Sequence, residues 1–305
     1  MPESQSPTVR ILFIGDVVGT AALAMVARML PSLATKYQSD FIIVNGENIA
    51  EGKSLTKKHA QALFAAGAQI ITTGNHVWDR WDVRALLAEE RRILRPANYP
   101  RENVGSGFAI GETKSGVKIG VIDLQGRTYM QTIDCPFRVS NWAIDKVSEQ
   151  AHIIIVDMHA EATAEKQTMA RYLDGKVSAV LGTHTHVQTA DAQILPNGTA
   201  FISDVGMSGP YESVIGMRID VAVKRFLNQT PYKYEIAQDG IRIAGVSVTI
   251  DVATGAAIEI ESFMFPEFDR SRSNGEQSEE EVEGEIIESE FEHVEGIPAV
   301  GEGDV

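Results

Sequence analysis

Side chains that can bind metal ions recur along the chain at the ends of short apolar runs. Each run is rich in β-branched residues and is followed at once by a polar cluster. The candidate ligands in these clusters are Asp16, Glu47, Asn48, Asn75, His159, His184 and His186. Imidazole, carboxylate and amide oxygen donors together suit a transition metal of intermediate softness, whereas oxygen donors alone would suit magnesium or calcium. Seven donors are enough for two metal ions that share a bridging carboxylate.

Each of these residues also has a purely structural interpretation. Asp16, in the segment GDVVG, could cap the helix that follows it. Glu47 and Asn48 could be ordinary turn residues. His184 and His186 point to the same side of an extended chain, where two histidines are often only a buried, hydrogen-bonded feature. Because all of these groups follow successive apolar runs, we expect their joint occurrence to mark a site.

The elements that must position these side chains follow one repeated order, which is an apolar run, a polar cluster and then a helical stretch. Residues 9–14, 41–44 and 70–73 are such runs, with Ala- and Leu-rich stretches such as residues 21–33 between them. This order is typical of βαβ units in a mostly parallel sheet. Ligands of such sheets bind beyond the carboxyl ends of the strands, so the candidate ligands are expected to converge on one rim.

The second half of the chain repeats the pattern with fewer helical stretches. Apolar runs at residues 118–124, 152–156, 179–181 and 200–202 are each followed by a polar cluster. The alternating segments 241–248 and 256–265 predict antiparallel strands that close the domain. We therefore expect an α/β protein in which two stacked sheets are flanked by helices.

Charge is unevenly distributed along the 305 residues, whose formal net charge is -15. Residues 276–305 contain 12 acidic residues and no Lys or Arg, which leaves the rest of the chain nearly neutral. Stable binding of a nucleic-acid duplex through a general basic surface is therefore not expected. Residues 268–305, rich in Ser, Gly and Glu, are predicted to be a disordered tail that either aids solubility or binds an unknown partner.

Composition also bears on the compartment. Cys135 is the only cysteine, so no intrachain disulfide can form. Residues 1–8, predicted to be a flexible N-terminus, lack the basic start and apolar stretch of a secretory signal. No apolar run reaches the roughly 20 residues that cross a bilayer. We therefore predict a cytoplasmic protein that binds no membrane, with its catalytic domain at residues 9–267.

Eight ordered motifs make the interpretation more specific: GDVVG, NGENIAEGKSLT, TTGNHVWD, RPANYP, LQGRTY, DMHAEATAEK, GTHTHVQTAD and DVGMSGPY. From about Val9 to Pro266, the chain resembles the YmdB family of calcineurin-like metallophosphoesterases, which act as 2',3'-cyclic-nucleotide 2'-phosphodiesterases. The resemblance implies a four-layer α/β/β/α sandwich with two stacked mixed sheets. It also implies hydrolysis of a small cyclic nucleotide to the 3'-monophosphate. As in this family, Asp16 lacks the nearby histidine of the wider superfamily, and NGENIAEG replaces GDxxD.

The same resemblance implies a site with two metal ions. One ion would be bound by Asp16, Glu47, Asn48 and His186, and the other by Glu47, Asn75, His159 and His184, so that Glu47 bridges them. The metals of the family are iron or manganese, whereas the ligand types alone would accept zinc equally well. His76 matches the proton-donating histidine of the family.

The chemistry of phosphodiester cleavage gives these residues separate tasks. Two metal ions can lower the pKa of a water and orient it for attack. A sugar alkoxide is a poor leaving group, so His76 is the candidate general acid. Asp79 could orient the His76 ring or simply begin a helix. Arg127 could contact the phosphate and Tyr211 the base, or both could make only local contacts.

Two other functions fit the same residues. One is hydrolysis of a different phosphate ester. The other is a regulatory scaffold that senses a nucleotide at the metal site and recruits a partner through the acidic tail. The family resemblance also implies a homo-oligomer, although no heptad pattern or interface patch in the sequence indicates one.

Overall fold

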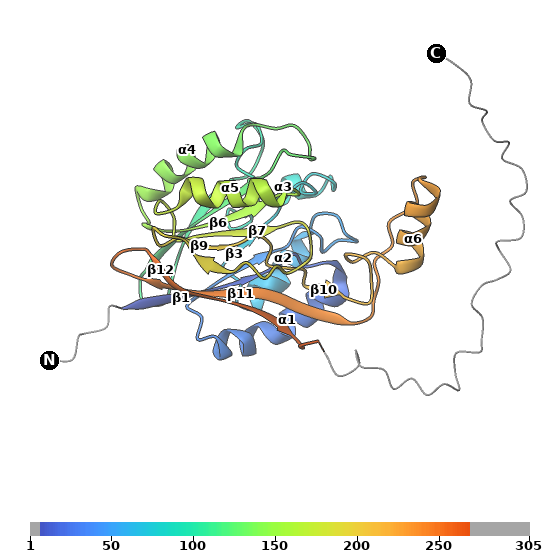
Figure 1. Cartoon of the computed structure of the whole chain (residues 1–305), viewed down its shortest axis with the longest axis horizontal. Helices are drawn as coiled ribbons and strands as arrows, with labels where there is room; N and C mark the ends of the chain where they lie inside the picture. The colour runs from blue at the N-terminus through green and yellow to red at the C-terminus, as the bar shows by residue number, and fades with distance from the viewer. Residues whose placement is uncertain (1–6, 269–305) are drawn as a thin grey trace, which may run out of the picture. The chain divides into compact units, whose positions relative to one another are not determined.

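Two β-sheets pack face to face, with helices on both outer sides (Figure 1). The computed structural model describes residues 7–268, and the structural statements below concern those residues. The first sheet has the order β10-β11-β1-β2-β3, and β12 also pairs with β11. Its strands are β1 (Thr8–Ile14), β2 (Phe41–Asn45), β3 (Ile70–Thr72), β10 (Gly209–Pro210), β11 (Ile241–Asp251) and β12 (Ala257–Phe265). β1, β2 and β3 are parallel, whereas β11 is antiparallel to β1, so the sheet is mixed.

The second sheet is also mixed and has the order β4-β5-β6-β7-β9-β8. Its strands are β4 (Phe108–Glu112), β5 (Lys118–Gln125), β6 (Ile153–His159), β7 (Ala179–Thr183), β8 (Gln193–Ile194) and β9 (Ala200–Ile202). The four central strands β5, β6, β7 and β9 are parallel. The edge strands β4 and β8 run antiparallel to their neighbours.

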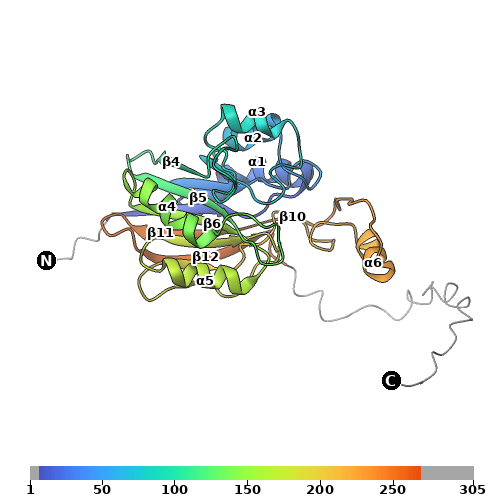
Figure 2. The same cartoon turned by 90° about the horizontal axis from the view of Figure 1, so that it is seen from above.

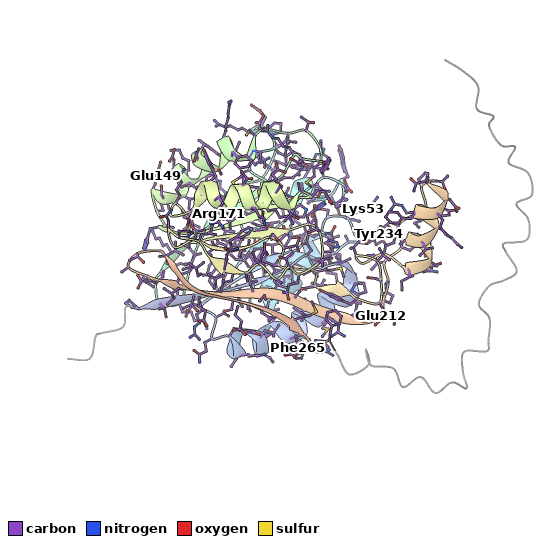
Figure 3. All side chains as sticks on the ribbon, viewed as in Figure 1. Lys53, Glu149, Arg171, Glu212, Tyr234 and Phe265 are labelled. Carbon is purple, nitrogen blue, oxygen red and sulfur yellow. The ribbon has the colours of Figure 1, made fainter. Side chains whose placement is uncertain are left out.

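Alternation of side chains along the strands divides the core into three apolar layers. In β1, Leu12 and Ile14 pack in a layer with α1 (Gly19–Lys36), α2 (Lys57–Ala65) and α3 (Val83–Glu89). Ile11 and Phe13 alternate with them and pack against the second sheet. Side chains fill the space between the sheets (Figure 3).

The third layer covers the outer face of the second sheet. Ile122 of β5 and Ile154 of β6 pack there with α4 (Pro136–Ser148) and α5 (Thr163–Leu173). The view in Figure 2 shows α1, α2 and α3 gathered in one part of the domain and α4 and α5 in another. The predicted four-layer α/β/β/α sandwich is thus confirmed.

Six strands end differently from the sequence prediction. β2, β5, β7 and β11 continue one to three residues beyond their predicted ends, to Asn45, Gln125, Thr183 and Asp251. β6 was expected to end at residue 156 but continues through His159, because its polar residues pair in register with β5 and β7. β3 was expected to include Thr73 but ends at Thr72. The backbone N–H of Thr73 donates to Asp123 Oδ2 of the second sheet at 3.0 Å, which draws the chain out of the first sheet.

The last helix, α6 (Ile219–Asn228), lies between β10 and β11 in the chain and projects from the two sheets (Figure 1). Its residues Val221 and Ala222 form a small apolar cluster with Met217 and Tyr234. None of the helices that the structure describes combines the length and apolarity needed to cross a membrane. Most of the predicted flexible N-terminus and acidic tail lies at residues 1–6 and 269–305, outside the described residues.

Candidate metal centre

At the carboxyl ends of the central strands, the layer between the sheets changes from apolar to polar. The inward positions there are Asn45 of β2, Thr72 of β3, Asp123 of β5, Asp157 of β6 and Thr183 of β7, and all five are buried. Asp157 accepts hydrogen bonds from Asn45 Nδ2 at 3.0 Å, Thr72 Oγ1 at 2.6 Å and Thr183 Oγ1 at 2.7 Å. These five residues, here called the polar floor, join the two sheets beneath the predicted ligands.

The seven predicted ligands lie at the same end of the two sheets. They follow β1 (Asp16), β2 (Glu47 and Asn48), β3 (Asn75) and β7 (His184 and His186), or end β6 (His159). Asp16, Glu47 and His159 are fully buried, and Asn48 is nearly so. The structure therefore brings together residues that are up to 170 positions apart in the chain.

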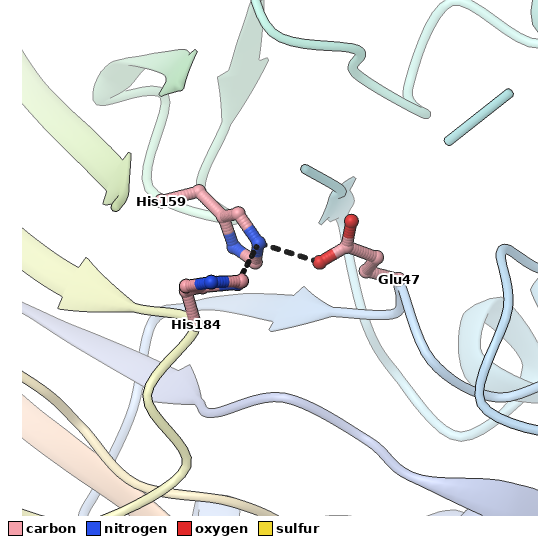
Figure 4. A group of neighbouring side chains, drawn as sticks. All are labelled: Glu47, His159 and His184. Carbon is pink, nitrogen blue, oxygen red and sulfur yellow. Dashed lines mark hydrogen bonds and ion pairs between the residues drawn. The ribbon is translucent and has the colours of Figure 1, made fainter. Parts of the chain in front are cut away.

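His159 Nε2 lies at the centre of one group of donor atoms. It is 2.6 Å from Glu47 Oε2, 3.1 Å from Asn75 Oδ1 and 3.1 Å from His184 Nδ1. Figure 4 shows Glu47, His159 and His184 converging from separate segments. Ligand atoms of these three side chains all lie within 4.8 Å of one another. Carboxylate, amide oxygen and imidazole donors facing one point form a set that fits a transition metal ion.

A second group surrounds Asp16. Its Oδ1 atom is buried, accepts no hydrogen bond and lies 3.9 Å from His159 Nδ1 and 4.0 Å from His186 Nε2. Asn48 Nδ2 is 3.3 Å from His186 Nε2. Burial raises the pKa of Asp16 despite the nearby imidazoles. A buried carboxylate oxygen without a donor is costly unless a cation accompanies it, so this group also fits a metal ion.

A hydrogen-bonded chain orients the ring of His159. Thr183 Oγ1 donates its one proton to Asp157 Oδ1, so it accepts a hydrogen bond from His159 Nδ1 at 2.9 Å. Nε2 is then the ring nitrogen that faces Glu47 and Asn75. Outer contacts of this kind fix the orientation of metal-binding histidines.

The rings of the other two histidines are oriented in the same manner. His184 Nε2 is 3.1 Å from Glu161 Oε2, which leaves Nδ1 toward His159. His186 Nδ1 donates to the carbonyl oxygen of Ile215 at 2.9 Å, which leaves Nε2 toward Asp16. In each ring, one nitrogen is held by the protein and the other is available as a ligand.

The backbone that carries these two histidines is strained. His184 has a φ of 94° and His186 a φ of 65°, in the left-handed region that residues other than glycine rarely adopt. Between them, the N–H and hydroxyl of Thr185 donate to Asp204 Oδ2 at 3.0 and 2.6 Å. Lys166 Nζ donates to the same oxygen at 2.8 Å, and both charged side chains are 1% exposed. This buried ion pair holds the strained segment in place.

Burial and mutual attraction set the protonation of the central pair. Burial by itself would raise the pKa of Glu47, but the adjacent His159 ring lowers it to about 2. Burial would lower the pKa of His159, but Glu47 raises it to about 9. Burial and the neighbouring His159 lower the pKa of His184 to about 3. A metal ion that binds here must displace the proton shared by Glu47 and His159.

His76 lies beside the ligands and next to an open cavity. Its backbone N–H donates to Glu47 Oε1, and its Nδ1 is 2.9 Å from Asp79 Oδ2, the contact considered from the sequence. The cavity has a volume of about 280 Å³ and is lined by Asn75, His76, Asp79, Tyr129, Met130, Gln131 and His184. A molecule in this cavity would therefore meet both His76 and the candidate ligand His184.

Neither of the two predicted substrate contacts lines this cavity. The backbone N–H of Arg127 donates to the Glu165 carboxylate at 3.2 Å. The Tyr211 hydroxyl donates to the Met207 carbonyl at 2.9 Å, and burial raises the pKa of Tyr211 to about 12. Sequence reasoning passed over Tyr129, which does line the cavity and follows Arg127 by two positions in the same motif.

The two sheets of this α/β protein are mixed and packed against each other, and a cluster of histidine and carboxylate side chains lies at their strand ends. This arrangement matches metallophosphoesterase-like phosphatase structures. A family model described as "YmdB-like protein" matches residues 12–263. The chain belongs to this family, as the ordered motifs of its sequence predicted.

Individual relatives agree with this assignment. The chain is 44% identical over 255 residues to a Bacillus subtilis (strain 168) protein named 2',3'-cyclic-nucleotide 2'-phosphodiesterase, covering 84% of this chain and 96% of that protein. It matches the crystal structure of a hypothetical protein from Thermus thermophilus with a TM-score of 0.79 at 40% identity, over 84% of this chain and 99% of the other. A structure described as a novel phosphatase from Mycoplasma pneumoniae matches with a TM-score of 0.80 at 35% identity, over 85% and 94% of the two chains.

Proposed function

We propose that the protein is a metal-dependent phosphodiesterase that opens 2',3'-cyclic nucleotides to 3'-monophosphates. The observation that carries the proposal is the convergence of Glu47, Asn75 and His184 on His159 Nε2 beside an open cavity. The name of the Bacillus subtilis relative, which is 44% identical, supports the same substrate and regiochemistry.

The donor atoms fit two metal ions. Glu47, Asn75, His159 and His184 would hold one, and Asp16, Asn48, His186 and the shared Glu47 would hold the other. The ligand types suit iron, manganese or zinc. When bound, such ions supply a water of lowered pKa and neutralise charge on the phosphoryl oxygens.

His76 would act as the general acid in this reaction. The Asp79 carboxylate accepts from His76 Nδ1 at 2.9 Å, which orients the ring and leaves Nε2 to protonate the departing 2' oxygen. The His76 side chain is 37% exposed, so it can take up a new proton from solvent after each turnover. The His76 backbone also donates to Glu47, so the acid and the proposed bridging ligand are held together.

The test is turnover of 2',3'-cyclic AMP by the metal-loaded protein, with chromatography that separates 3'-AMP from 2'-AMP. His76→Ala should lower kcat by about 100-fold to 10,000-fold while metal content stays unchanged. His152→Ala, at an exposed histidine whose Nε2 lies 2.6 Å from the Val252 carbonyl, is the matched control and should keep full activity. Release of 2'-AMP, or unchanged turnover in His76→Ala, would contradict the assignment.

Hydrolysis of phosphate monoesters is the second candidate, because the Mycoplasma pneumoniae structure is described as a phosphatase. Comparing release of phosphate from 3'-AMP with ring opening of 2',3'-cyclic AMP separates the two activities. A cytoplasmic location, a homo-oligomer and a partner for the acidic tail remain predictions from the sequence and its family resemblance.

A further inference from the structure

A second cavity shares one lining residue with the cavity that faces His76. It has a volume of about 600 Å³, and Gln131 lines both cavities. Sites for small organic ligands usually measure about 300–1,000 Å³, so the 280 Å³ cavity alone is at the small end for a nucleotide. The proposed reaction on a mononucleotide gives no task to the larger cavity.

The larger cavity is lined by aromatic, amide and guanidinium side chains, and also by Asp134, Val104 and Ile133; of the aromatic residues, Tyr99 is buried. Trp78 and Tyr99 form an edge-to-face aromatic pair with ring centroids 5.8 Å apart. The Arg84 guanidinium lies 5.8 Å from the centroid of the Trp78 ring, and Asn103 and Gln131 add side-chain amides. Aromatic faces stack on bases, amides read base edges and guanidinium groups bind phosphates.

Tyr129 stands at the smaller cavity in a conformation that packing does not require. The residue is 91% exposed and its φ is 61°, which is unfavourable for an aromatic residue. The loop before it is anchored, because the backbone N–H groups of Arg127 and Thr128 donate to the Glu165 carboxylate at 3.2 Å. An exposed aromatic ring on an anchored loop is suited to stacking on a planar ligand.

We infer that the two cavities form one cleft for a short single-stranded RNA end that terminates in a 2',3'-cyclic phosphate. This inference rests on the proposed function. Tyr129 stacks on the base of the terminal nucleotide, and the larger cavity binds the nucleotide on its 5' side. Arg84 contacts the phosphodiester that joins them. The domain lacks an excess of basic residues, so binding is confined to these few nucleotides and does not extend to a duplex.

The test compares kcat/KM of the metal-loaded full chain for 2',3'-cyclic AMP and for an adenine dinucleotide with the same cyclic terminus. The wild type should prefer the dinucleotide by about tenfold or more, because Arg84 contacts its phosphodiester and a further base binds in the larger cavity. Arg84→Gln should remove most of this preference and leave kcat/KM for 2',3'-cyclic AMP unchanged. Arg91→Gln, at an exposed arginine outside the cavity lining, is the matched control and should keep the preference.

Variants of Tyr129 test the stacking contact separately. Tyr129→Ala should raise KM for both substrates by about tenfold with little change in kcat, and Tyr129→Phe should behave like the wild type. Equal kcat/KM for the two substrates, with no effect of Arg84→Gln, would overturn the inference and leave the proposed function standing. If the metal-loaded wild type hydrolyses neither substrate, the proposed function and the inference both fail.

Discussion

Removing the charge of Lys166 should destabilise the protein and loosen the segment that carries His184 and His186. Lys166 Nζ donates to Asp204 Oδ2 at 2.8 Å, to the Thr183 carbonyl at 2.7 Å and to Thr185 Oγ1 at 3.2 Å. Lys166→Met deletes these three bonds and leaves Asp204 buried without its cation. Breaking a buried ion pair typically costs about 3–5 kcal/mol.

The structure places the expected cost at the lower end of that range. Asp204 keeps three other donors, which are the N–H and hydroxyl of Thr185 at 3.0 and 2.6 Å and the Gly206 N–H at 2.8 Å. We therefore expect Lys166→Met to lower the free energy of unfolding by about 3 kcal/mol. The double variant Lys166→Met with Asp204→Asn has no unpaired charge. Its loss of unfolding free energy should therefore be smaller than the sum of the two single losses, by about 1 kcal/mol or more.

Urea unfolding of the two single variants, the double variant and the wild type completes a double-mutant cycle. Lys146→Met is the matched control, because Lys146 pairs with Glu149 at 2.7 Å on the surface and should change stability little. Losses that add within about 0.5 kcal/mol would refute the ion-pair reasoning. If Lys166→Met binds metal as tightly as the wild type, Lys166 does not position His184 and His186.

Three further predictions concern the surroundings of the ligands. Gly74→Ala should abolish tight metal binding in titration calorimetry, because a Cβ there would overlap the His159 ring; wild-type affinity would contradict this. Thr183→Val removes the acceptor of His159 Nδ1 and should weaken metal binding by about 10-fold to 100-fold. Thr168→Val, at an exposed helical hydroxyl, is its control and should bind normally. Burial and the neighbouring Asp157 hold the pKa of Asp123 well above its usual value of 3.8. Asp123 therefore ionises at lower pH in the unfolded chain than in the folded one, and the free energy of unfolding falls as the pH rises above 3.8. Asp123→Asn should therefore raise the unfolding free energy of chelator-treated protein at pH 7 and change it little near pH 3.5, as urea unfolding at both values would show; equal stability of variant and wild type at pH 7 would oppose it.

The layer order could be predicted from the sequence because it depends on local periodicity. Alternation in β1 separates Ile11 and Phe13 from Leu12 and Ile14, and the apolar runs between helices indicate a parallel sheet. The gathering of the seven candidate ligands at one end of the sheets could be predicted because strand ends of such a sheet share one rim. The distances between these side chains could not be predicted, because they depend on the packing of the two sheets against each other.

The polar floor could not be predicted from the sequence for a related reason. Asp157 lies in the segment IIIVDMH, where a carboxylate after four apolar residues favours the end of a strand. Its hydrogen-bond donors Asn45 and Thr72 are 112 and 85 positions away, so nothing local indicates that the strand continues through His159. Buried polar residues in a strand become favourable only when such distant partners are in place.

Some residues in helices and loops have surroundings that the local sequence does not indicate, because their contacts are distant in sequence. Lys166, in the segment AEATAEK, has the pattern of a surface lysine but is 1% exposed, because it pairs with Asp204, 38 positions further along the chain. Tyr211, and not Tyr129, was proposed from the sequence as a substrate contact, whereas Tyr129 is the tyrosine that lines the cavity beside His76.

Anomalous diffraction from crystals of the metal-loaded protein, recorded at the absorption edge of the bound metal, tests the central claim most directly. Two peaks are expected, which mark one metal ion bound by His159 Nε2 and His184 Nδ1 and another bound by Asp16 and His186. The metal–nitrogen distances should be those of transition metal sites, about 2.0–2.1 Å for zinc. Peaks located away from these side chains, in protein that contains two equivalents of metal, would contradict the account.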